Sequence, residues 1–444
     1  MSTATSISPA TGGFSVATFE SHCSDRVEPS WLLDRRREAF AQFRSAPWPT
    51  LRDEEWRRTD IRAFKLASFR PPGIESPSAE AREILAPSWD ALSKTYASGI
   101  EHIDAQLTRP AQAADLPPGV VFTDLATAAK THPHLLERYL LTQAVDPATD
   151  AFSALHAAFW TGGTLLYVPK GVKVEAPLFG LVGMSASGKV DFNHTLIVLE
   201  EGASATFVQE ATGRGKGDAA SLHVGAVELI VGARASLRFV NIQNWDSGTW
   251  HFSRERATVG RDAELQWTVG GLGARLAKVN QEVALVGEGA RAQVNGVMFT
   301  SGRQHLAYFT RQDHQAPHTT SDLLYKGGLK DASRIVWKGM IRVEKDAQKT
   351  DAYQKNNSLL LSEAARADSI PGLEIEANDV RCTHGATAGA VDDEMIFYLR
   401  SRGIRREEAI RLIVEGFFAN VYDRITVEPV RETLRRAVAD KLEL

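Results

Sequence analysis

The chain has 444 residues, which is more than one compact domain usually holds, so two or three structural regions around a large core are expected. Its 51 Lys and Arg residues nearly balance its 55 Asp and Glu residues, and the net charge is −4. Because the sequence also has no run of basic residues, nucleic acid is not an expected partner.

The cysteine count and the N-terminus bear on the cellular compartment. Cys23 and Cys382 are the only cysteines, too few for a disulfide framework, which favours a reducing compartment. No apolar run approaches the roughly 18 residues that a membrane helix needs. The N-terminus lacks the charged flank and apolar core of a signal peptide. A transit peptide is weakly suggested, since no acidic residue precedes Glu20, but no arginine precedes Arg26 either. We therefore expect a cytoplasmic protein that does not bind membranes.

The first part of the chain is expected to be helical after a disordered start. Residues 1–28 are rich in Ser, Thr, Ala and Gly, and we expect them to be disordered. Apolar residues recur at helical spacing between Pro29 and Phe43, and the Pro-Trp-Pro segment at 47–49 ends that helix. We assign residues 29–161 to an N-terminal helical region.

From Gly162 the sequence changes to alternating Val, Ile, Thr and Phe with Gly at the breaks, which is typical of strands and turns. This part of the chain carries an internal repeat of about 28 residues. The repeat aligns four sets of residues, namely Gly202, Ala205 and Phe207; Gly232, Ala235 and Leu237; Gly260, Ala263 and Leu265; and Gly287, Ala290 and Ala292. Val343 and Ala347 continue the register about two periods later.

One long period with several short strands favours a β-solenoid, in which each glycine marks a turn. The competing architecture is a β-sandwich, whose strands are not expected to keep a single long period. We assign residues 162–390 to a solenoid core of mainly β structure, flanked on both sides by helical regions.

Cys382 and His384 are the most distinctive pair in the sequence. They stand two residues apart in an extended segment, and strand side chains alternate between faces, so both should point to the same side. A thiolate and an imidazole suit iron or zinc, but two ligands cannot close a metal site. Any metal would therefore be shared with another part of the protein or another chain. The alternative is a buried thiol beside a hydrogen-bonded imidazole, with no metal.

Residues 391–444 are predicted to form a C-terminal helical domain. Asp392 and Asp393 can cap a first helix that ends at Gly403. A second helix has an apolar stripe, and Pro429 opens a third, whose apolar residues recur every four positions. The stripe of the second helix is formed by Ile410, Ile413, Phe417 and Val421.

Other candidate sites are weaker. His305, His314 and His318 could imitate a metal set with Asp313, but their spacing in a solenoid does not require them to converge. The Gly-rich segments at 213–217 and 270–273 lack the Gly-Lys-Ser/Thr ending of a phosphate-binding loop. A carbohydrate-active solenoid enzyme would need paired carboxylates on one face, and no coil position between Gly202 and Ala347 repeats them.

Several segments together resemble the SufB/SufD family of the SUF iron-sulfur cluster assembly system. They are residues 54–60 (Glu-Glu-Trp-Arg-Arg-Thr-Asp), 318–329, 347–354, 357–362, 382–389 (Cys-Thr-His-Gly-Ala-Thr-Ala-Gly) and 392–403. SufB members have a Glu-His-Glu run where this chain has Cys-Thr-His, and they carry a core cysteine that is absent between Cys23 and Cys382. The resemblance therefore favours the SufD branch, with a SufB-like scaffold as the alternative.

The resemblance implies a right-handed parallel β-helix that acts as a scaffold and not as an enzyme. It implies pairing with SufB, with His384 and perhaps Cys382 contributing to a cluster site shared with that partner. No cofactor is expected to be bound stably, although a transient iron-sulfur cluster could form at the SufB interface. Whether the isolated chain forms a homodimer is left open.

The resemblance also implies that the C-terminal helices dock the SufC ATPase. Ile413, Phe417 and Phe418 are the candidate docking residues. Phe418 lies off the apolar stripe, and an exposed aromatic there could anchor a partner, because a few buried aromatics usually dominate the energy of an interface. Alternatively, Phe418 packs on the third helix.

Overall fold

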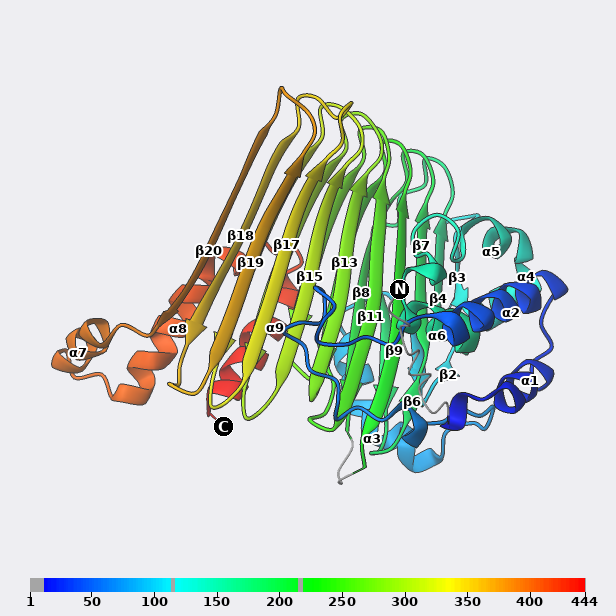
Figure 1. The fold of residues 1–444 in the computed structure, drawn as a ribbon, viewed down its shortest axis with the longest axis horizontal. Helices are drawn as coiled ribbons and strands as arrows, with labels where there is room; N and C mark the ends of the chain where they lie inside the picture. The colour runs from blue at the N-terminus through cyan, green and yellow to red at the C-terminus, as the bar shows by residue number, and fades with distance from the viewer. Residues whose placement is uncertain (1–11, 113–115, 215–218, 444) are drawn as a thin grey trace, which may run out of the picture.

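The structure, a computed structural model, describes residues 12–112, 116–214 and 219–443. Its core is a flattened solenoid in which the chain alternates between two facing parallel sheets (Figure 1). Sheet A has the strand order β2-β1-β5-β8-β10-β12-β14-β16-β18-β20, and sheet B has the order β19-β17-β15-β13-β11-β9-β7-β4-β3. The prediction of a β-solenoid between helical regions is confirmed.

The elements have the following bounds. Sheet A contains β1 Ser98–Ile103, β2 Gln106–Arg109, β5 Leu178–Met184, β8 Ser204–Gly213, β10 Ser236–Asn244, β12 Glu264–Gly271, β14 Arg291–Thr300, β16 Thr320–Leu329, β18 Asp351–Leu360 and β20 Arg381–Ala390. Sheet B contains β3 Val121–Asp124, β4 Gly162–Val168, β7 Asn193–Leu199, β9 Ser221–Val231, β11 Thr249–Val259, β13 Leu276–Leu285, β15 His305–His314, β17 Arg334–Val343 and β19 Arg366–Ile375, while β6 Val190–Asp191 pairs with β9. The helices are α1 Val16–Ser24, α2 Ser30–Ser45, α3 Ala79–Ser93, α4 Leu125–Thr131, α5 Pro133–Tyr139, α6 Ala151–Phe159, α7 Asp393–Ser401, α8 Arg406–Tyr422 and α9 Glu428–Glu443, with short 3-10 turns η1 Gly12–Phe14, η2 Leu66–Ser68 and η4 Pro147–Thr149.

The coils repeat around one turn residue with a left-handed backbone conformation. In successive coils this residue, with φ between 54° and 73°, directly precedes a small buried residue. The left-handed residues are Gly202, Arg234, Asp262, Gly289, His318 and Lys349, and the small residues that follow them are Ala203, Ala235, Ala263, Ala290, Thr319 and Thr350. Ala203, and not Ala205, therefore matches Ala235, so the predicted register was wrong by two residues in the first set and right in the other three.

The N-terminal part differs from the sequence-based expectation at two places. Residues 1–11 lie outside the described residues, but residues 12–28 are not disordered: they form η1 and α1, because Phe14 and Phe19 are buried against Phe159. The expected helical region also contributes three strands, since β1 pairs with β5 and β3 pairs with β4. The solenoid thus begins well before Gly162.

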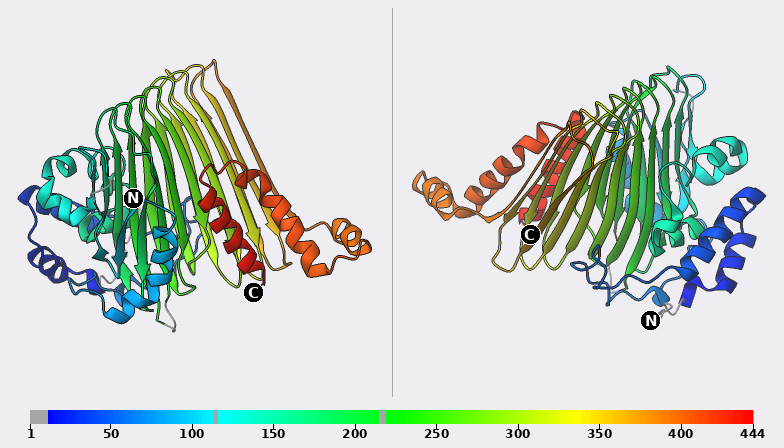
Figure 2. Two further views of the ribbon diagram at one scale, coloured as in Figure 1. Left: turned by 180° about the vertical axis from the view of Figure 1, so that it is seen from behind. Right: turned by 45° about the horizontal axis from the view of Figure 1, so that its top comes forward.

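Two sets of helices cover the solenoid on opposite sides. Apolar residues of α2 and α6 share a buried cluster with outward residues of sheet B, including Leu196 and Phe252. On the other side, α8 and α9 lie against sheet A, and α7 extends away from the sheet at the end where β20 lies (Figures 1 and 2). Among the described residues, none of the helices is both long and apolar enough to cross a membrane.

The C-terminal helices begin and end near the expected residues, but α8 buries a different stripe. Asp392 caps α7 by accepting a hydrogen bond from the Glu394 amide at 2.9 Å, and Gly403, with φ 86°, follows its end. The buried stripe of α8 is formed by Val414, Phe418, Val421 and Tyr422, whereas Ile410, Ile413 and Phe417 are only partly buried. The predicted stripe was therefore wrong by about one residue.

Candidate functional site

The solenoid ends in a coil that no further coil covers. β19 pairs only with β17, and β20 only with β18, so among the described strands each is the edge of its sheet. The inward faces of both strands are correspondingly accessible: Leu373 and Ile375 of β19 are 37 % and 40 % exposed, and Ala386 of β20 is exposed as well. This open end of the solenoid, formed by β19 and β20, presents unpaired backbone groups and apolar side chains together.

Cys382 and His384 both lie on the inward side of the open end. Their neighbours on β18 are Ala352 and Gln354, whose side chains are buried in the interior, and in-register parallel neighbours point the same way. His384 is exposed, while Cys382 is partly buried against the last apolar cluster of the interior. The prediction that the two residues share one face is confirmed by this register.

The thiol and the imidazole differ in readiness to bind a metal. Burial, helped by the Asp351 carboxylate, raises the pKa of the Cys382 thiol above its usual value of 9.0, so the thiol is protonated at neutral pH. His384 is exposed and free to present either ring nitrogen. In the described part of the chain, no group of three or more His, Cys, Asp or Glu side chains could hold a metal ion. These two residues therefore form an incomplete ligand set.

The rest of β20 leaves room beside these two residues. The inward positions that follow His384 are small, being alanines at 386, 388 and 390. A partner's side chains could therefore approach the inward face of β20 closely.

The proposed docking residues of α8 are not displayed as expected. Phe418 is fully buried, with its ring stacked at 5.8 Å on Tyr422, so it packs on sheet A and on its own helix and not on a partner. Gly328 lies beneath the ring on sheet A, next to Phe299, which belongs to the same buried cluster as Phe418. Ile413 and Phe417 are partly buried. Phe418 as an exposed anchor is therefore incorrect.

A different apolar surface, on α7, escaped the sequence interpretation. Phe397 is 73 % exposed and Tyr398 is 56 % exposed, with Met395 beside them, while Ile396 is the only buried residue of the helix. The helix packs mainly on α8. A run of five consecutive large apolar residues in a nine-residue helix could have indicated this, because one helix face cannot bury them all.

The three other histidines have separate places. His314 is buried in the interior, where its ring bonds to the hydroxyls of Thr319 and Ser321 at 2.7 and 2.8 Å, and burial lowers its pKa to about 4. His318 is the left-handed turn residue of its coil. His305 is partly buried at the start of β15 beside Arg334. They do not converge on one point.

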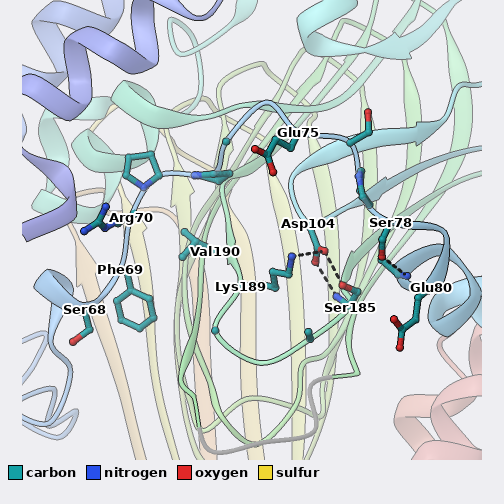
Figure 3. Close-up of a pocket in the computed structure, with 18 residues that line it drawn as sticks. Ser68, Phe69, Arg70, Glu75, Ser78, Glu80, Asp104, Ser185, Lys189 and Val190 are labelled. Carbon is teal, nitrogen blue, oxygen red and sulfur yellow. Dashed lines mark hydrogen bonds and ion pairs between the residues drawn. The ribbon is translucent and has the colours of Figure 1, made fainter.

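A groove of about 760 Å³ lies at the other end of sheet A, beside the first coil (Figure 3). At its centre the Asp104 carboxylate accepts hydrogen bonds from the amide and hydroxyl of Ser185 at 2.9 and 2.7 Å and pairs with Lys189 at 3.1 Å. Asp104 follows β1 and Ser185 follows β5, so this groove is remote from β20 in the strand order. Its central charge is already balanced.

Comparison with known proteins covers nearly the whole chain. Residues 182–417 match the family model described as SUF system FeS cluster assembly, SufBD core domain, and residues 19–179 match the SufBD protein N-terminal region. The chain is 31 % identical to the iron-sulfur cluster assembly protein SufD of Bacillus subtilis, over 94 % of this chain and 95 % of that protein. It is 30 % identical to an iron-sulfur cluster assembly SufBD family protein of Staphylococcus saprophyticus, over 88 % and 85 % of the two chains. The chain therefore belongs to the SufB/SufD family of SUF iron-sulfur cluster assembly proteins.

Proposed function

We propose that this chain is a non-catalytic scaffold subunit of SufD type, which pairs with SufB through the open end of its solenoid. The observation that carries the proposal is the uncovered last coil, where two ten-residue edge strands and exposed apolar side chains surround His384. Edge strands left unpaired in a folded protein invite pairing with another chain. The likeness to SufD of Bacillus subtilis favours SufD type over the SufB-like alternative, and the family match speaks against a carbohydrate-active enzyme.

At this interface His384 would bind the nascent cluster, which is the cargo of the system and not a resident cofactor. Cys382 would contribute less, because its thiol must first lose a proton that burial holds in place. The partner would have to supply the remaining ligands, since these two residues cannot complete a site. We place this cluster assembly in the cytoplasm, because the free thiol of Cys382 is kept reduced in such a compartment.

The pairing surface can be tested with a charge placed on the inward face of β20. Ala386→Arg should abolish binding to SufB, because the new guanidinium would be buried unpaired in the interface, yet it should leave the isolated chain folded, because this residue is exposed. Binding is measured by copurification of the two chains, with circular dichroism as the check of folding. The matched control is Ala186→Arg, an exposed alanine beside the groove of the first coil. Normal SufB binding by Ala386→Arg would refute pairing through the open end.

We further propose that SufC docks on α7 and the exposed side of α8, and that Phe397 is the main anchor. Phe397 is a large aromatic residue that α7 leaves exposed although the helix packs on α8, and aromatic residues are enriched among interface hot spots. Ile413 and Phe417, partly exposed on α8, would lie at the margin of the same surface.

Phe397→Ser is expected to weaken SufC binding at least about tenfold, since loss of a buried aromatic anchor typically costs about 2 kcal/mol or more. Isothermal titration of SufC onto the chain measures the effect. Val27→Ser removes an apolar side chain that is 83 % exposed at the far end of the chain, and it should leave SufC binding unchanged. Equal binding by both variants would place the SufC surface elsewhere.

A further inference from the structure

Glu255 is a carboxylate buried inside the solenoid with little to neutralise it. Only 4 % of the residue is exposed, and its oxygens accept hydrogen bonds from the Asn241 amide and the Ser253 hydroxyl, each at 3.1 Å. It borders an internal cavity of about 30 Å³, which can hold on the order of two water molecules. Two amide oxygens that border the cavity, of Asn193 and Gln243, have no hydrogen-bond partner among the described residues, so the cavity has the polar lining that holds water.

From Glu255 a row of polar side chains runs along the interior of sheet B toward the open end. Gln281 is the neighbour of Glu255 on the next strand, and Thr310 is the neighbour of Gln281 on the strand after that. Both residues are almost fully buried, and the Gln281 Nε2 and Thr310 Oγ1 atoms have no partner in the described part of the chain. Buried polar atoms in folded proteins are nearly always bonded, to water where protein offers nothing.

The row crosses to sheet A at its fourth position. There the neighbour of Thr310 is Gly339, which has no side chain, and its place is shared by the edge of the Trp337 ring and the Gln354 amide from the opposite sheet. An added Cβ at Gly339 would lie 2.4 Å from the Gln354 Oε1 atom, which is itself unpartnered, while the Gln354 Nε2 atom donates to the Gly372 carbonyl at 3.0 Å. Gln354 lies on β18, where its neighbour on β20 is His384, so the row of polar side chains reaches the open end.

We propose that a chain of ordered water molecules follows this row and connects His384 with Glu255. The water chain carries protons, and the Glu255 carboxylate binds them. The span is about four strand spacings, or roughly 20 Å. In the step, a proton leaves a ligand at the open end and passes through the water chain, and the Glu255 carboxylate becomes a neutral carboxylic acid; no electron moves. The existence of the water chain does not depend on the function proposed above. Its role in cluster assembly does, because ligands lose protons when they bind a metal.

Among the groups that border the cavity, Glu255 is the one that exchanges protons near neutral pH; farther on, Asp191, 3.4 Å from the His223 ring, also has its pKa raised by burial to about 7. Burial raises the pKa of Glu255 to about 7. Burial lowers the pKa of His251 to about 3 and that of His223 well below its usual value, so both rings are neutral. Tyr308 and Tyr325 keep their protons, because burial raises their pKa values.

Infrared spectroscopy of the isolated chain tests both parts of the proposal. In the difference between the spectra of the wild type and Glu255→Gln, from which the Asp191 carboxyl cancels, we expect a protonated carboxyl band that is present in acid and disappears with a midpoint near pH 7. In heavy water the band should shift at least about tenfold more slowly in Thr310→Val than in the wild type, because the valine interrupts the water chain and leaves only rare opening of the structure for exchange. Gln281→Leu should slow the shift similarly.

The control is Thr268→Val, a buried threonine on the outward face of β12, which should exchange like the wild type. A Glu255 band that does not titrate between about pH 5 and 9, or equal exchange in Thr310→Val and Thr268→Val, would overturn the proposal. If cluster assembly has the same pH profile in the Glu255→Gln complex and in the wild-type complex, the water chain has no role in assembly. Since the infrared measurements need no partner, they stand apart from any failure of the proposed function.

Discussion

Replacing His384 by alanine is expected to lower cluster assembly by the complete SufB-containing complex at least about tenfold, with the complex still formed. Loss of a residue that merely orients a metal ligand commonly costs 10-fold to 100-fold, so loss of the ligand itself should cost no less. Folding should be unaffected, since His384 is exposed on an edge strand and supports no core packing. The measurement is the rate of cluster formation by absorbance, together with the amount of SufB that copurifies.

Two neighbours of His384 sharpen this test. Cys382→Ser should have a smaller effect than His384→Ala, because the thiol is held protonated and partly buried. Thr383→Ala changes the exposed residue between them, whose side chain points to the outward face, and should leave assembly unchanged. If His384→Ala builds clusters at the normal rate, the histidine is not a ligand and the shared site must be sought elsewhere.

Removal of residues 404–444 is expected to make the chain aggregate, contrary to the independence that solenoid coils usually have from one another. The helices α8 and α9 bury a large apolar face of sheet A, formed by Val240, Ile242, Leu272, Val297, Phe299 and Leu324. Burying one such side chain contributes about 1.5–3 kcal/mol. Uncovering all of them would expose a patch far larger than isolated proteins tolerate in water. Size-exclusion chromatography and circular dichroism of the truncated chain measure the outcome.

A single substitution separates this packing role from docking. Phe418→Ser should lower the free energy of unfolding by about 3–5 kcal/mol, since it removes a fully buried ring and leaves a cavity against the sheet. Phe397→Ser, on an exposed ring of α7, should leave the free energy of unfolding unchanged within about 0.5 kcal/mol. Denaturant titrations of the two variants are compared with the wild type. Equal stabilities would mean that α8 contributes no packing energy to the solenoid.

The architecture, and the shared face of Cys382 and His384, were predictable because both leave local traces in the sequence. The solenoid follows from small residues repeated at one turn, such as Ala235 and Ala263, and the shared face follows from the two-residue spacing of Cys382 and His384 in one strand. The burial of Phe418 was not predictable in the same way. It depends on contacts with residues of sheet A that lie far earlier in the chain, such as Phe299 and Leu324.

Other errors have similar causes. The composition of residues 12–28 suggests disorder, yet two phenylalanines suffice to order them once Phe159 is available from α6. The row from Glu255 to Gln354 has no local pattern at all. Its members lie tens of residues apart and meet only through strand register, and one of them fills the space of a glycine from the other sheet.

The uncovered edges of β19 and β20 also bear on how a cell must produce this protein. Two parallel edges of ten residues, side by side and partly apolar, can template the pairing of other extended chains as readily as that of the right partner. Synthesis in excess of the partner would therefore leave orphan molecules that stick to one another or are degraded. Balanced supply of the two subunits, by neighbouring genes or by shared translation, would keep this surface covered from the moment it folds.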